Sequence, residues 1–114
     1  MRIDISDKQN LMSQTANDNT IARTETAFSK FERHIQSITI SVQDANGPRG
    51  GVDKICRIVV RLKRLQEVVV TSENESLASA ITEALNRTSR SVNRKLSRRE
   101  KSRTTSLPRV SFGY

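Results

Sequence analysis

The sequence predicts an α+β fold in the order β-α-β-β-β-α, with one four-stranded sheet and two helices packed on one face. Segments with apolar residues at every second position alternate with two segments whose apolar residues recur every three or four positions. A chain of 114 residues is the usual size of one domain. Such a chain supplies one layer of apolar side chains between two layers of structure. A single sheet covered by two helices satisfies all three observations.

The N-terminal part predicts one strand, a loop and the first helix. The segment RIDIS alternates two isoleucines with polar residues, which is typical of a strand at residues 2–6. Residues 7–19 are polar and are interpreted as a loop. From Thr20 to His34 the spacing becomes helical and predicts an amphipathic helix. Its apolar stripe is expected to consist of Ile21, Thr24, Phe28, Phe31 and Ile35.

Three further segments predict an antiparallel meander. They are SITISVQD, KICRIVVRLK and QEVVVTS, at residues 37–44, 54–63 and 66–72. The glycine- and proline-containing segment ANGPRGG between the first two is interpreted as a mobile loop. In the middle strand the residues that alternate with the apolar ones include Arg57 and Arg61. The face of the sheet opposite the core is therefore expected to be partly basic and solvated.

A long second helix is predicted after the last strand. Ser72 precedes Glu75 by three residues, as in a capping box, and Asn74 is an alternative cap. The apolar stripe of this helix continues into the basic segment SVNRKLSRR, which is therefore expected to be helical. The stripe consists of Leu77, Ile81, Leu85, Thr88, Val92 and Leu96. We assign residues 1–103 to one domain and residues 104–114, which lack periodicity, to a flexible C-terminal tail.

The net charge of +8 is concentrated at the C-terminal end of the chain. Residues 1–86 contain 11 basic and 11 acidic side chains, whereas residues 87–114 contain 9 basic and 1 acidic. At about 100° per residue, five basic side chains fall within about 80° of one another, on the side of the second helix away from its apolar stripe. We call these five residues the basic rail: Arg87, Arg90, Arg94, Arg98 and Lys101.

Clustered positive charge favours a polyanionic partner, and nucleic acid is the preferred interpretation of the rail. The alternatives are a solvated helix face, an acidic protein and a membrane surface. A helix lying on a membrane would carry bulky Trp, Phe and Leu where this helix has Ala, Ser, Thr and Val. The sheet has no aromatic platform for stacking bases, so recognition of phosphates and shape is expected. If they face solvent, Arg57, Arg61 and Lys63 would add a second basic surface, although such residues are more often simply solvated.

Catalysis has little support in the sequence. His34, the only histidine, is interpreted as a surface residue at a helix end, and Cys56 as a buried apolar residue. Asp4, Asp7 and the segment GPRGG match no carboxylate site or phosphate-binding loop. We expect no enzyme activity, metal, cofactor or small-molecule substrate. The N-terminus lacks the apolar core of a signal peptide, and no apolar run approaches the ~20 residues that span a bilayer, so we expect a cytoplasmic protein without a membrane partner.

The order of elements and two segments resemble the ribosome hibernation promoting factor and ribosome-associated inhibitor family over about residues 2–102. In FSKFERHIQSITISV, the residues Phe31, Glu32, Arg33 and His34 occupy the places of a Leu-Glu-Arg-His-like segment by which the first helix of that family enters a strand. TSENESLASAIT followed by NRTSRSVNRKLSRREK resembles a divergent form of the acidic start and basic remainder of the family's second helix.

The resemblance implies a stress-response factor of stationary phase that binds ribosomal RNA phosphates on the small ribosomal subunit. It would block the channel for messenger and transfer RNA and hold idle ribosomes inactive. The chain resembles a short form without the domain by which long members pair ribosomes, and we expect a monomer when free. The expected RNA contacts are the rail and, as a second row if the two helices lie side by side, Lys30 and Arg33.

Two alternatives remain open at this point. One is an adaptor that docks on acidic protein surfaces or on the transcription machinery. The other is a double-stranded RNA-binding domain, in which a helix, three strands and a helix also follow one another. That class places a lysine cluster at the start of its second helix, where this chain has the acidic segment SENES.

Overall fold

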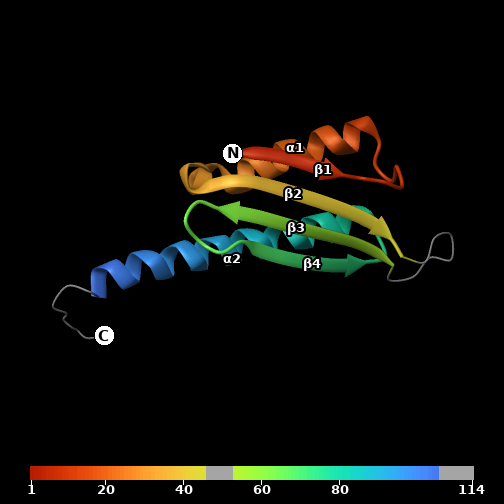
Figure 1. Cartoon of the computed structure of the whole chain (residues 1–114). Helices are drawn as coiled ribbons and strands as arrows, with labels where there is room; N and C mark the ends of the chain where they lie inside the picture. The colour runs from red at the N-terminus through yellow and green to blue at the C-terminus, as the bar shows by residue number, and fades with distance from the viewer. Residues whose placement is uncertain (46–52, 106–114) are drawn as a thin grey trace.

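The computed structural model of the chain describes residues 1–45 and 53–105, with side chains up to residue 98. The elements follow the predicted order (Figure 1). They are β1 (Arg2–Ser6), α1 (Gln14–Phe28), a 3-10 helix η1 (Ser29–His34), β2 (Ile35–Asp44), β3 (Lys54–Leu62), β4 (Val68–Asn74) and α2 (Leu77–Thr105). The predicted fold class is thus confirmed.

The four strands form one mixed sheet in the order β1-β2-β3-β4. β1 runs parallel to β2, with Ile3 opposite Ile38, because α1 carries the chain back to the starting end of the sheet. β2, β3 and β4 form the predicted antiparallel meander, in which Ile58 lies opposite Ile40 on one side and Val70 on the other. A domain that consists only of a helix, three strands and a helix, as in the double-stranded RNA-binding alternative, would lack the parallel β1–β2 pair.

Both helices lie on the same face of the sheet, and they run in the same direction (Figure 1). α1 covers the β1 and β2 side, and α2 packs across β3 and β4. Figure 1 also shows α2 continuing past the ends of the strands. Leu96 is the last residue of α2 that is buried among the side chains described, which extend to residue 98.

The first helix begins earlier than the sequence analysis predicted, because part of the expected loop at residues 7–19 is helical. α1 starts at Gln14, where the Ser13 Oγ accepts a hydrogen bond from the Ala16 N–H at 3.1 Å. The preceding loop is ordered by Asp7, whose two carboxylate oxygens accept the N–H groups of residues 11 and 12, each at 2.8 Å. Residues 14–19 at the start of α1 are polar except for Ala16, which is partly buried against the core, so periodicity did not reveal this part of the helix.

The end of the first helix also differs from the prediction. α1 ends at Phe28, and the remaining residues to His34 form η1. In a 3-10 helix, residues three apart point the same way, so Phe28 and Phe31 both enter the core, with 0% and 6% of their surface exposed. Ile35, which was expected on the helix stripe, is the first residue of β2 and is buried there.

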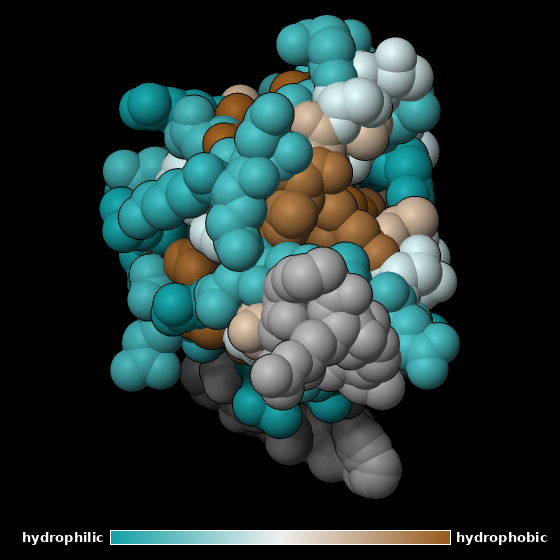
Figure 2. All heavy atoms as spheres, turned by 90° about the vertical axis from the view of Figure 1, so that its right-hand side faces the viewer, coloured by the Kyte–Doolittle hydropathy of each residue, from teal (hydrophilic) through white to brown (hydrophobic). Residues whose placement is uncertain are grey.

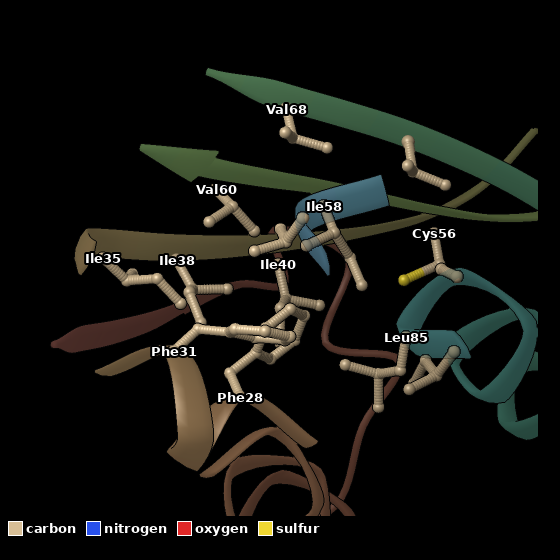
Figure 3. Packing of buried hydrophobic residues seen from close by; sticks show 14 of the residues in the cluster. Phe28, Phe31, Ile35, Ile38, Ile40, Cys56, Ile58, Val60, Val68 and Leu85 are labelled. Atoms are coloured by element: carbon tan, nitrogen blue, oxygen red, sulfur yellow. The ribbon is translucent and has the colours of Figure 1, made fainter. Parts of the chain in front are cut away.

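The core lies between the inner face of the sheet and the two helices. Figure 3 shows Phe28 and Phe31 packed against Ile38 and Ile40 of β2, with Leu85 approaching from α2. The predicted stripe of α2 is buried from Ile81 to Leu96, and Leu77 is half-buried. The predicted inward residues of β3 are likewise buried: Cys56, Ile58, Val60 and Leu62.

Figure 2 shows the end of the molecule that carries the β1–α1 loop and the start of α2. A hydrophobic area lies near the centre of this view with hydrophilic atoms beside it, and smaller hydrophobic areas appear toward the left. The interpretation of ANGPRGG as a mobile loop concerns residues 45–51, of which all but Ala45 lie outside the described residues. The predicted tail from Thr104 also lies outside them, except that α2 extends to Thr105.

Candidate nucleic-acid interface

α2 supplies the candidate interface, and Ser76 caps its N-terminus. The Ser76 Oγ accepts a hydrogen bond from the Ser79 N–H at 3.3 Å, and the Ser76 carbonyl accepts one from the Ala80 N–H at 3.0 Å. The predicted capping box at Ser72 is wrong, because Ser72 pairs with β3 as part of β4 and is buried. Asn74, the alternative cap, is the last residue of β4. Pairing with β3 therefore prevailed over the local capping signal.

Two side chains attach α2 to the free edge of the sheet. The Arg87 Nη1 donates a hydrogen bond to the Thr71 carbonyl oxygen at 3.0 Å. One turn earlier, the Glu83 carboxylate accepts a hydrogen bond from the Ser72 hydroxyl. β4 is the last strand of the sheet, so Arg87 satisfies a backbone acceptor at an open edge. These contacts hold the rail side of α2 beside β4.

The remaining described members of the rail are Arg90, Arg94 and Arg98, and all three side chains are exposed. None of them forms a hydrogen bond or an ion pair within the described residues. At about 1.5 Å of rise per residue, they follow one another every 6 Å or so along the helix. Unpaired guanidinium groups in such a row are available to phosphate oxygens. Lys101 belongs to α2, but its side chain is not among those described.

A hollow of about 300 Å³ lies between α2 and the beginning of β4. It is lined by Glu67, Val68, Ser91, Arg94, Lys95 and Arg98. Three of its six lining residues are therefore cationic, and Lys95 is half-buried in it. Arg94 and Arg98, which we call the downstream half of the rail, thus border a concave surface with an excess of positive charge.

Lys30 and Arg33, the expected second row, are exposed on η1 and not on α1. The two helices do lie side by side, and the Arg23 Nη2 donates to the Thr82 Oγ1 at 2.7 Å between them. Thr82 and Arg87 are five positions apart, or about 140° around the helix axis. α1 therefore approaches the flank of α2 that is turned away from the rail. No hydrogen bond or ion pair within the described residues joins Lys30 or Arg33 to the rail, and their contact with RNA stays a prediction.

The open face of the sheet is solvated, as predicted. Arg57 and Arg61 are exposed on it, and Lys63 is exposed in the turn that follows β3. The Arg61 Nε lies 3.7 Å from the Glu67 carboxylate. Val69 is exposed in β4, and the four described strands contain no aromatic residue. The sheet thus offers no surface on which bases would stack.

The two side chains with shifted pKa values, Cys56 and Lys54, lie away from the rail. Cys56 is fully buried, and burial raises the pKa of its thiol to about 12. At the base of the β2–β3 connection, the Lys54 Nζ lies 2.9 Å from Asp53 Oδ1 and 3.4 Å from Asp44 Oδ2. The hydrogen bond to Asp53 raises the pKa of Lys54. His34 is half-buried at the end of η1. Within residues 1–45 and 53–105, no group of three or more His, Cys, Asp or Glu is placed to hold a metal ion.

Comparison with known proteins identifies the family. The family model described as Sigma 54 modulation protein / S30EA ribosomal protein matches residues 13–100. The chain belongs to this family. The match runs from the cap of α1 to just beyond Arg98, so it includes both helices, the meander and the described part of the rail. The resemblance seen in the sequence is thereby confirmed, and the family is one of ribosome-associated factors.

Solved structures show the same fold. The N-terminal domain of Thermus thermophilus Protein Y matches with a TM-score of 0.66 and 19% identity, covering 82% of this chain and 98% of that domain. A ribosomal subunit interface protein from Coxiella burnetii matches with a TM-score of 0.67 and 13% identity, covering 85% and 99% of the two chains. A search of curated protein sequences found no match. In the described part of the chain, no helix has the length and apolar character needed to cross a membrane.

Two cationic groups escaped the sequence analysis. Lys95 lies between the apolar stripe and the rail on the helical wheel, and it lines the hollow beside Arg94. Arg64, next to Lys63 in the β3–β4 turn, is also exposed. A finer helical wheel would have placed Lys95 at the boundary of the rail. The nearness of the turn to α2 depends on the packing of α2 across β4.

Proposed function

We propose that this protein binds the small ribosomal subunit through ribosomal RNA phosphates, occupies the channel for messenger and transfer RNA, and keeps idle ribosomes from translating. The observation that carries the proposal is the row of unpaired arginines, Arg90, Arg94 and Arg98, on a helix attached to the sheet. Membership of the Sigma 54 modulation protein / S30EA ribosomal protein family supports a ribosomal partner. The ribosomal subunit interface protein from Coxiella burnetii, which has the same fold, adds to this support.

Electrostatic attraction supplies the physical basis of the proposed binding. Each phosphate that a cation neutralises releases condensed counterions, and the logarithm of affinity falls with the logarithm of salt by about 0.7 to 0.9 per contact. Contacts by the three arginines would thus contribute a slope of about 2 to 3. Inhibition would follow from steric exclusion, without turnover, cofactor or small-molecule substrate. The proposal places the protein in the cytoplasm.

Sucrose-gradient sedimentation of a stationary-phase lysate tests this function. At low salt the wild-type protein is expected to sediment with small subunits or whole ribosomes, and at high salt or after ribonuclease treatment it is expected to stay at the top. Reversal of Arg90, Arg94 and Arg98 to Glu should abolish co-sedimentation without loss of circular-dichroism signal, because these exposed side chains form no hydrogen bond or ion pair within the described residues. The control reverses three exposed cations elsewhere: Arg2, Lys8 and Arg57.

Three outcomes would contradict the proposal. A folded triple variant that sediments normally would remove the rail from the interface. Equal loss of binding in the control would attribute the effect to net charge alone. A wild-type protein that stays at the top under every condition would exclude the ribosome, and it would favour docking on the transcription machinery, in line with the sigma 54 modulation for which the family is named.

A further inference from the structure

We propose that the β3–β4 turn, through Lys63 and Arg64, is a second RNA contact that acts together with the downstream half of the rail. The inference rests on the proposed function and adds residues to the same interface. Lys63 and Arg64 lie far from the rail in sequence, so the charge distribution along the chain does not associate them. Only their position in the tertiary structure associates them with the rail.

The turn is held to η1 at its start and borders the hollow of α2 at its end. The Lys63 N–H donates a hydrogen bond to the His34 carbonyl oxygen at 2.9 Å, which attaches the turn to the end of η1. At the other side of the turn, Glu67 lines the hollow that Arg94 and Arg98 of α2 also line. In Figure 1 the turn joins β3 to β4 at the end of the sheet past which α2 projects.

The charges at this end of the molecule are strongly unbalanced. Lys63 and Arg64 are exposed, and neither has an ion pair or a side-chain hydrogen bond within the described residues. The acid of the hollow, Glu67, has Arg61 at 3.7 Å on the open face of the sheet, which offsets its charge. Arg94, Lys95 and Arg98 line the hollow that the end of the turn borders, so the cations of the turn and of α2 lie at the same end of the sheet, where they would raise the local concentration of phosphate groups.

The backbone of Arg64 gives a second reason to assign a role to its side chain. Its φ is 65°, in the left-handed region that glycine and asparagine adopt more readily than arginine. An arginine at such a position costs about 1 kcal/mol or more of local backbone energy. The conformation of the turn therefore does not account for an arginine here. An asparagine at this position would keep the turn and remove the charge.

Backbone phosphates suit this surface better than bases do. Its cations come from Lys and Arg without an aromatic neighbour in the turn or on β4, so stacking has no platform. Cations without aromatic side chains position RNA by its phosphates and do not read its sequence. We therefore expect the turn to strengthen binding to structured RNA in general, with the ribosomal location supplied by the shape of the whole complex.

The test is a double variant, Lys63→Gln with Arg64→Asn, titrated against isolated small subunits and against an RNA hairpin at several salt concentrations. The dissociation constant is expected to rise about tenfold at low salt, and the salt slope to fall by about 1.4 to 1.8 for two lost contacts. The control, Lys8→Gln with Arg57→Gln, removes the same charge from the opposite end of the sheet and from its open face. It should change affinity less than twofold, and both variants should melt as the wild type does.

The two probes separate this proposal from the proposed function. A turn variant with wild-type affinity and slope, or a control that loses as much, would overturn the assignment of the turn. Wild-type protein that binds the hairpin but not the subunits would contradict the ribosomal function, and the turn would then be judged on the hairpin alone. Binding to neither probe would remove RNA from both proposals and favour an acidic protein.

Discussion

Arg87 and Arg90 are neighbours in the basic rail, and they have different physical roles. Arg87 donates to the Thr71 carbonyl at the free edge of β4, whereas Arg90 has no hydrogen bond or ion pair within the described residues. The sequence offers no signal for this difference, because both residues are arginines on one flank of the same helix. We therefore assign Arg87 to the support of the interface and the three residues from Arg90 to Arg98 to its contact surface.

Replacement of Arg87 tests this division. Arg87→Ala should lower the free energy of unfolding by about 1 kcal/mol, because it removes a hydrogen bond and leaves a strand edge uncovered. Arg90→Ala is the matched control, and its free energy of unfolding should stay within about 0.5 kcal/mol of wild type. Urea denaturation measures both. Equal stability of the two variants would show that the Thr71 contact does not hold α2.

Cys56 shows how burial alone sets the chemistry of a side chain. Its thiol is fully buried in β3, and burial raises its pKa to about 12 from an ordinary value near 8.5 to 9. The thiolate is the reactive form, so the native protein keeps this cysteine inert at neutral pH. Cys56 has no place in the interface, in agreement with its interpretation as a buried apolar residue.

The raised pKa of Cys56 predicts a loss of stability at alkaline pH. The folded state holds the thiol proton more tightly than the unfolded state does, so the associated stability is complete below about pH 8.5 and is lost as pH rises toward 12. Over this window, wild type should lose up to about 1.4 kcal/mol per pH unit more than Cys56→Ala. Urea unfolding at pH 7 to 11 measures the difference, and parallel curves for the two proteins would contradict it. Lys54, whose pKa is also raised, is present in both proteins, so its contribution to the pH dependence cancels in the comparison.

At the scale of elements, α2 carries two separate surfaces, an apolar one that packs on the sheet and a basic one that bears the arginines. Its stripe from Ile81 to Leu96 packs on β3 and β4, and its arginines occupy the flank next to β4. The sheet holds the helix through the stripe, so the cations need no acidic partners on the same helix. This arrangement leaves the charges unpaired and available to a ligand.

A negative charge placed in the apolar stripe of α2 should unfold the protein, whereas the same charge on the exposed surface of the helix should not. Val92 is fully buried, and Val92→Asp would bury a carboxylate without a partner, so we expect it to unfold the protein at neutral pH. Asn93→Asp introduces the same charge at the exposed neighbour and should melt as wild type does. Circular dichroism during heating compares the two. A Val92→Asp protein with a full helical signal and the wild-type melting temperature would refute the assigned burial.

The first helix illustrates what periodicity detects and what it misses. The pattern beginning at Thr20 identified the segment with the buried residues of α1, which include Thr24 and Phe28, although Ile21 of the predicted stripe is only half-buried. The turns from Gln14 onward are polar, and the cap at Ser13 is a short-range signal that many loops also contain. Likewise, Ser72 and Glu75 match a capping box in sequence, but strand pairing extends β4 to Asn74 and moves the cap to Ser76.

At the scale of the whole molecule, the cations of the β3–β4 turn and the arginines Arg94 and Arg98 lie at one end of the sheet. α2 leaves the sheet there, and the β3–β4 turn and η1 meet through the hydrogen bond between Lys63 and His34. The opposite end carries the apolar area seen in Figure 2. Lys30 and Arg33 are exposed on η1, which follows α1, so an RNA bound along the rail would meet them only if it also reached η1.

The sequence by itself determined the order of elements, the inward residues of β2 and β3, the apolar stripe of α2 and the concentration of charge on α2, and it indicated the family. Each of these depends on periodicity or composition along a continuous stretch of chain. Only the tertiary structure decided that Arg87 is bound to β4, that Lys30 belongs to η1 and that the turn with Lys63 and Arg64 lies at the end of the sheet past which α2 projects. These relations depend on which flank of α2 faces which neighbour, and local propensities do not encode the packing of distant segments.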